Sequence, residues 1–201
     1  MVTFFIGLAA FLGGFIFGLD IGTMTGSIRL IQNEFSSSSG EAGLIASTSL
    51  FGCIIGSVLA PLLSVERKKL IFLSSTLFIL GNLGLTFSET LPQLFFFRVL
   101  IGVAIGFSAF AIPLYVAELA PKEKRGGLVS IYQFSITLGI LSAFFLGYAH
   151  AGELLWRPLF LYNGTLAAIF LILLPLFPSG EPIVLKKHPI LKKPLFIGLG
   201  L

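Results

Sequence analysis

The chain has 201 residues, of which 56% are hydrophobic and only 11% are charged, with a formal net charge of +4. A soluble domain carries about 25% charged residues, so this composition excludes an ordinary water-soluble protein and indicates an integral membrane protein. The single cysteine, Cys53, excludes an internal disulfide framework and a cysteine-based zinc site.

Six apolar stretches are long enough to cross a bilayer as helices, which takes roughly 20 residues each. In chain order they are 2–27, 43–65, 70–87, 94–116, 128–148 and 158–177. They predict an all-α, multi-pass membrane protein whose residues 1–177 form one bundle of six transmembrane helices. We expect residues 178–194 to form a short basic cytoplasmic linker and residues 195–201 to begin a truncated seventh helix.

Basic residues alternate between rich and poor loops along the chain. Residues 66–69 and 121–126 hold three Lys or Arg each, and the stretch after the sixth span holds four. The intervening loops hold one or none. Because loops rich in Lys and Arg face the cytoplasm, both ends of the six-helix unit are expected there, in the plasma (inner) membrane. We therefore attribute the net positive charge to the loops that set the orientation in the membrane, and we expect no nucleic-acid partner.

Two charged residues, Asp20 and Arg98, are set well inside apolar spans. An isolated charge at the bilayer centre costs about 2.5–3.5 kcal/mol on insertion scales, and an opposite charge on a touching helix offsets much of it. An ionisable residue within the membrane predicts a functional site. The alternative is a structural ion pair that locks two helices together.

Glycines recur at every fourth residue in three of the spans, which predicts close helix–helix contact along those faces. They are Gly14, Gly18, Gly22 and Gly26 in the first span, Gly52 and Gly56 in the second, and Gly102 and Gly106 in the fourth. Asp20 lies roughly 160° around an ideal helix from this stripe, so packing face and carboxylate point in different directions. The first and fourth spans each combine glycines with one embedded charge, as a three-plus-three repeat would.

Five motifs in order resemble the N-terminal half of a sugar porter of the major facilitator superfamily. They are GGFIFGLDIGTMTG (13–26), FRVLIGVAIGF (97–107), PLYVAELAPKEKRGG (113–127), YQFSITLGI (132–140) and WRPLF (156–160). The resemblance implies one half of a major facilitator fold that moves a sugar, a hexose or a pentose, by alternating access between two six-helix halves. The implied partners are a sugar, protons, the lipid bilayer and a second six-helix half, which could be a separate chain.

The resemblance also implies roles for individual residues. Proton-coupled members carry an acid in the first helix and an arginine in the fourth, and Asp20 and Arg98 match them. A carboxylate beside an arginine can alternate between an ionised, paired form and a protonated, released form. The sequence therefore predicts secondary active transport by proton symport.

Four residues match or adjoin the sugar-binding positions of this family. Gln133 matches a glutamine that hydrogen-bonds sugar hydroxyls, for which an amide suits because it both donates and accepts. Phe17 matches an aromatic at the cavity wall, with core packing as the alternative. Ile136 and Ile140 lie one and two turns after Gln133 and would line the same face, or else contact lipid or another helix.

Glu118 and Arg125 match a cytoplasmic charge network that latches the outward-facing state, and Arg67 belongs to the basic cluster opposite. The alternative for all three is a solvated loop charge that contributes little. The stretch LLSVERKKL keeps the basic cluster but lacks the family's Asp and Gly, which leaves this side of the gate incomplete.

Other function classes find less support in the sequence. No residues at ligand or nucleophile spacing indicate a metal site, a cofactor or a catalytic group, so a transporter is expected rather than an enzyme. Two alternatives remain: a truncated, non-transporting fragment that serves as a structural or interaction protein, and a porter for another small solute such as an organic acid or phosphate. The motif Asn163-Gly164-Thr165 fits a glycosylation acceptor but lies in a span, so we discount it.

Overall fold

The computed structural model describes residues 2–63, 65–149 and 156–179, which form six long helices and two short 3₁₀ turns. The long helices are α1 (Val2–Phe35), α2 (Ser39–Leu62), α3 (Arg67–Thr86), α4 (Leu91–Leu119), α5 (Arg125–Ala149) and α6 (Arg157–Leu173). The turns η1 (Lys122–Lys124) and η2 (Leu174–Leu176) precede α5 and follow α6. Six described helices are long and apolar enough to cross a membrane, which confirms the predicted all-α fold class. The predicted linker beyond residue 179 and the predicted seventh helix lie outside the described residues.

The first helix is longer than its apolar run. α1 continues past the predicted end at Ser27 to Phe35, and Ile31 is buried in the core on this added part. The polar run of serines then ends it, and Ser38 starts α2 through a capping box in which Ser38 Oγ accepts from the Glu41 backbone N–H. The first loop is therefore a tight turn between two helices.

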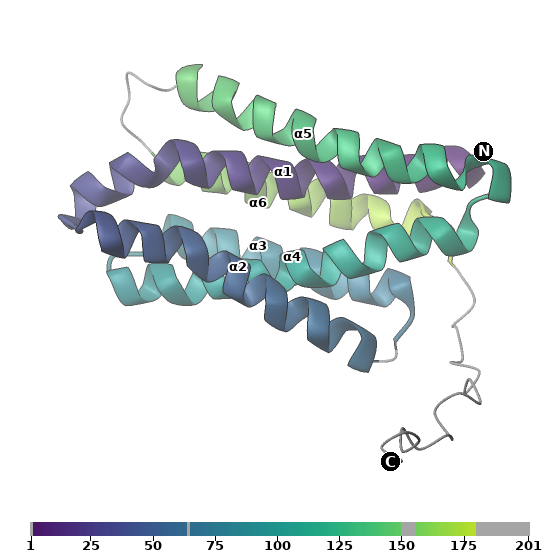
Figure 1. The fold of residues 1–201 in the computed structure, drawn as a ribbon, viewed down its shortest axis with the longest axis horizontal. Helices are drawn as coiled ribbons and strands as arrows, with labels where there is room; N and C mark the ends of the chain where they lie inside the picture. The colour runs from purple at the N-terminus through teal and green to yellow at the C-terminus, as the bar shows by residue number, and fades with distance from the viewer. Residues whose placement is uncertain (1, 64, 150–155, 180–201) are drawn as a thin grey trace, which may run out of the picture.

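The most extensive helix–helix contacts are those of α1 with α5 and of α2 with α4 (Figure 1). Glycines line both contacts. A Cβ at Gly14, Gly18 or Gly22 would overlap atoms of α5, and one at Gly139 would overlap the backbone of α1. In the same way, Gly52 and Gly56 on α2 face Gly102 and Gly106 on α4. Gly26 has no neighbour within 4 Å of a Cβ, so the contact stripe ends at Gly22.

These two pairs support the predicted three-plus-three arrangement. If α1, α2 and α3 are exchanged with α4, α5 and α6, the α1–α5 contact becomes the α4–α2 contact. α3 and α6 contact each other, and a contiguous core joins residues from α1, α3, α4 and α6. Glycines on both helices of a pair let the two backbones approach closely.

The two ends of the bundle are tied by different polar contacts. At one end, Lys68 Nζ donates to the carbonyls of Pro175 and Phe177 at 3.3 and 2.7 Å. At the other end, Arg157 pairs with Glu34 and donates to the Ser88 carbonyl. The basic stretches at 66–69 and 121–126 lie at the same end of the bundle, the end that holds the N-terminus in Figure 1.

Candidate functional site

Asp20 on α1 and Arg98 on α4 form a buried ion pair in the interior of the bundle. Arg98 Nη1 lies 3.3 Å from Asp20 Oδ1 and 3.4 Å from Oδ2, and the two residues are 2% and 1% exposed. The sequence places these charges 78 residues apart, and the crossing of α1 and α4 brings them together. Because the α1 glycines face α5, the carboxylate is directed to the opposite side of α1, as the helical geometry predicts.

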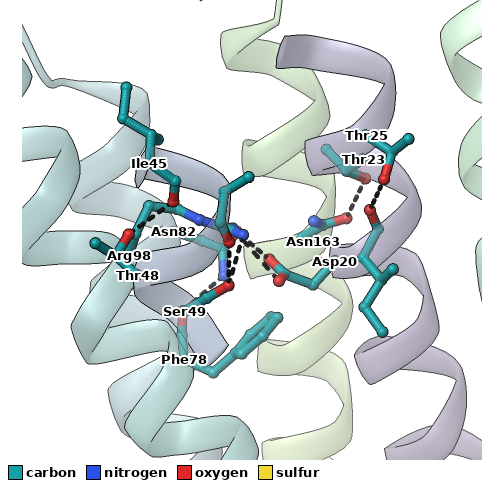
Figure 2. A network of polar contacts seen from close by, with 12 residues as sticks. Asp20, Thr23, Thr25, Ile45, Thr48, Ser49, Phe78, Asn82, Arg98 and Asn163 are labelled. Carbon is teal, nitrogen blue, oxygen red and sulfur yellow. Dashed lines mark hydrogen bonds and ion pairs between the residues drawn. The ribbon is translucent and has the colours of Figure 1, made fainter. Parts of the chain in front are cut away.

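Two further side chains contact the Arg98 guanidinium. Nη2 donates to Ser49 Oγ on α2 at 3.0 Å, and the guanidinium carbon lies 5.9 Å from the centre of the Phe160 ring on α6. Figure 2 shows Arg98 reaching between Ser49 and Asp20. Arg98 thus contacts three helices besides its own.

A pocket of about 200 Å³ borders the pair between α1, α2 and α4. Asp20 and Arg98 contribute its charged groups, and its other walls are largely apolar. The remaining lining residues are Phe17, Ile21, Met24, Thr25, Ala46, Ser49, Leu50, Cys53 and Ile105. The ion pair is therefore buried from bulk solvent yet lies beside a space that water or a small solute can enter.

Buried amides lie close to the ion pair on its α3 and α6 side (Figure 2). Thr23 Oγ1 donates to Asn163 Oδ1 at 3.4 Å, and Asn82 Nδ2 donates to the Phe78 carbonyl at 2.9 Å. Asn163 is 1% exposed, a position no glycosyl group could reach in this fold. These groups are buried polar side chains inside the bundle.

The four predicted sugar-site residues occupy two faces. Phe17 lines the pocket beside Asp20, whereas Gln133 is exposed on α5. Ile136 and Ile140 are half-buried, and their backbones pack against Gly18 and Gly22 of α1. The structure therefore brings Phe17 to the ion pair and leaves Gln133 on the surface of the six-helix unit.

Two of the three predicted gate residues form an ion pair at one end of the bundle. Arg67 Nε lies 3.1 Å from Glu118 Oε1, with 19% and 16% of the two side chains exposed, and the Arg67 guanidinium lies over the Phe110 ring. Arg125 Nε instead donates to the Ala120 carbonyl at 3.0 Å. Arg67 and Glu118 are thus joined, while Arg125 secures the start of α5.

Sequence reasoning did not single out Ser49, Asn82 or Asn163 as members of this site. Each is a polar residue within an apolar span, and each is less than 10% exposed. A polar residue inside an apolar span is the sequence feature that could have identified them, since such a side chain is expected to find a partner. Only the tertiary contacts tell which of several such residues lies beside Arg98.

The six-helix architecture is that of one half of the major facilitator fold, and solved structures agree. The proton:xylose symporter XylE bound to 6-bromo-6-deoxy-D-glucose matches with a TM-score of 0.82 at 27% identity, covering 89% of this chain and 45% of XylE. The inward-open form of the xylose transporter XylE from E. coli matches with a TM-score of 0.81 at 28% identity, covering 89% and 48%.

The family model described as "Sugar (and other) transporter" matches residues 6–185, so the chain belongs to the sugar transporter family. The galactose-proton symporter of Escherichia coli K12 is 37% identical over 78% of this chain, and the arabinose-proton symporter of the same strain is 34% identical over 89%. The D-xylose transporter of Levilactobacillus brevis is 38% identical over 70%. The matched region spans 34%, 38% and 31% of these three relatives, about a third of their length.

Proposed function

We propose that the chain forms one half of a proton-coupled sugar transporter that moves a hexose or a pentose by alternating access. The observation that carries this proposal is the Asp20–Arg98 pair, which is 1% and 2% exposed and borders a pocket. Charges inside a membrane span are costly and are mostly found where they act on ions or substrates. The galactose-proton and arabinose-proton symporters among the relatives support the same function.

The pair offers a direct way to link proton binding to helix movement. While Asp20 is ionised, its attraction to Arg98 holds α1 against α4 beside the pocket. A proton on the carboxylate removes that attraction, so α1 and α4 can separate more easily. Conversely, a rearrangement that moves Arg98 away favours the protonated form, which gives the reciprocal coupling that symport requires.

The sugar would bind on the face that a second six-helix half completes. Gln133 is exposed on α5, where its amide can both donate to and accept from sugar hydroxyls. Phe17 would supply an apolar wall beside Asp20, and Ile136 and Ile140 would follow Gln133 along α5. An exposed amide on a membrane-spanning helix is costly in lipid, which favours a partner half over this face.

The Arg67–Glu118 pair would act as part of the gate at the basic end of the bundle, with Arg125 fixing the adjacent turn. The basic stretches at that end favour its placement in the cytoplasm, with the multi-pass unit in the plasma (inner) membrane. Sugar and protons are the transported partners, and the second half is the protein partner, whether it continues the same chain or is a separate one.

The test is uptake of labelled galactose, arabinose and xylose into proteoliposomes that hold the six-helix unit together with a second half. An imposed pH gradient should drive accumulation by the wild type. Asp20→Asn keeps the side-chain shape but cannot ionise, so it should abolish accumulation while sugar binding and exchange persist. Accumulation by a stably folded Asp20→Asn protein would contradict the proposal.

The same variants separate coupling from a purely structural pair. A structural pair predicts that Asp20→Asn and Arg98→Gln each lower the unfolding temperature and that the double variant recovers part of the loss. A coupling pair predicts that the folded single variants lose sugar accumulation and that the double variant does not regain it. Thermal unfolding in detergent, measured beside uptake, distinguishes the two.

A further inference from the structure

The guanidinium of Arg98 divides its donors between two helices. Nη1 serves both oxygens of Asp20 at 3.3 and 3.4 Å, and Nη2 donates to Ser49 Oγ at 3.0 Å. Nε has no hydrogen-bond partner within the described residues. An arginine and a carboxylate often form two parallel hydrogen bonds, one from each of two nitrogens, which is the stronger arrangement. Here only Nη1 faces the carboxylate, while Nη2 donates to Ser49.

Ser49 is held in the orientation that accepts this hydrogen bond. Its hydroxyl donates to the Ala46 carbonyl at 3.2 Å, which leaves the oxygen lone pairs free to accept from Arg98. The close approach of α2 and α4 fixes the backbone here, because a Cβ at Gly102 would overlap the Ser49 carbonyl. Ser49 thus has little freedom to release Arg98 by moving away.

We propose that Ser49 is a positioning residue that draws Arg98 Nη2 away from Asp20 and so keeps the carboxylate ready to accept a proton. With only one nitrogen on the carboxylate, the ionised form of Asp20 is stabilised less than it would be by a two-bond pair. Ser49 and the Phe160 ring also hold the guanidinium by contacts that do not depend on the charge of Asp20. This inference rests on the proposed role of Asp20 as the proton-binding group.

Few other titratable groups face Asp20 from the helices packed against α1. Cys53 on α2 lines the same pocket, and Tyr132 on α5 is buried against Gly14 of α1. Within the described residues lining the pocket, Arg98 therefore supplies the positive charge that a proton on Asp20 must oppose.

The test follows the protonation of Asp20 directly, by infrared spectroscopy of the chain in lipid bilayers as a function of pH. The carbonyl stretch of the protonated acid is assigned to Asp20 by its loss in Asp20→Asn. Ser49→Ala removes the competing acceptor, so Nη2 should turn to the carboxylate. The midpoint of Asp20 protonation should then fall by about one pH unit, a roughly tenfold loss of proton affinity.

Matched variants show whether the effect belongs to this hydroxyl. Ser57→Ala removes an exposed α2 serine that makes a similar backbone hydrogen bond, to the Cys53 carbonyl, and should leave the midpoint unchanged. Ser49→Thr keeps a hydroxyl and should stay near the wild-type midpoint. In Ser49→Cys, the thiol is a weaker acceptor, so the midpoint should shift in the same direction as in Ser49→Ala but by less. This variant replaces Ser49→Ala if the alanine variant does not fold.

The outcomes separate this inference from the function on which it rests. A midpoint that Ser49→Ala leaves unchanged or raises would overturn the role of Ser49 while leaving proton binding by Asp20 intact. A wild-type chain with no titrating band that depends on Asp20 would overturn the proposed proton-binding role and this inference together.

Discussion

Gly18 on α1 and Ile136 on α5 touch through their backbones, since a Cβ at Gly18 would overlap the Ile136 carbonyl oxygen. The first prediction tests this contact. Gly18→Ala should push the two helices apart and lower the free energy of unfolding by roughly 1–3 kcal/mol, the cost of overpacking. Thermal unfolding of the chain in detergent micelles measures the effect.

Gly26→Ala is the matched control for that measurement. Gly26 lies on the same helix at the same four-residue spacing, but nothing lies within 4 Å of a Cβ there. Because alanine favours a helix over glycine by about 1 kcal/mol, this change should be neutral or slightly stabilising. If both variants unfold like the wild type, the α1–α5 contact is looser than the structure indicates.

The second prediction concerns the Arg67–Glu118 pair at the basic end of the bundle. Glu118→Gln removes a half-buried ion pair of about 1 kcal/mol, so the equilibrium between open and closed gates should shift about fivefold toward the open one. The rate at which a thiol reagent labels a cysteine placed behind the gate, in a complete transporter, reports this shift. Exchanging the two residues, Arg67→Glu with Glu118→Arg, should restore part of the closed population.

Glu66→Gln provides the control for the gate. Glu66 pairs with Lys69 at 3.6 Å one turn apart on exposed surface, and such pairs contribute little. Its labelling rate should match that of the wild type. An equal effect of Glu66→Gln and Glu118→Gln would mean that net charge at this end, and not the Arg67–Glu118 contact, sets the gate.

The third prediction tests the sugar-binding role of Gln133. Gln133→Ala removes a hydrogen-bonding partner worth about 1–3 kcal/mol, so sugar affinity should fall roughly 5- to 150-fold. Equilibrium binding of labelled sugar to the complete transporter measures it. Phe134→Leu, at the next and also exposed position on α5, should leave the affinity unchanged. Unaltered affinity in Gln133→Ala would contradict a role for Gln133 in sugar binding.

The fourth prediction tests the orientation in the membrane. In a Cys53→Ala background, cysteines at Ser39 and Lys124, both exposed and at opposite ends of the bundle, should react with a membrane-impermeant reagent from opposite sides. Lys124 should be cytoplasmic, because its loop is rich in basic residues. Labelling of both from the same side would contradict the six-span topology.

Local sequence patterns were sufficient to predict the membrane spans, one helix contact face and the direction of Asp20. Long apolar runs predict helices of membrane length because the bilayer leaves the backbone no other way to satisfy its hydrogen bonds. The four-residue spacing of Gly14, Gly18 and Gly22 predicted a contact face, and the angular offset of Asp20 predicted that it would point elsewhere. Both follow from helical periodicity within one segment, and the structure confirms them. The apolar runs predict the helix ends less accurately. α1 continues beyond the predicted end at Ser27 to Phe35, through residues that are no longer purely apolar.

The identity of each partner was decided only by the tertiary structure. The glycine stripe does not say that α5 covers it, the basic cluster does not say that Arg67 reaches Glu118, and no motif places Ser49 on Arg98. These contacts depend on how the helices cross and on their axial register, which arise from packing many side chains at once and leave no periodic mark in any single segment. The sequence by itself thus determined six spans with two buried charges, while the assembly of α1, α2 and α4 determined that Asp20 shares Arg98 with a serine.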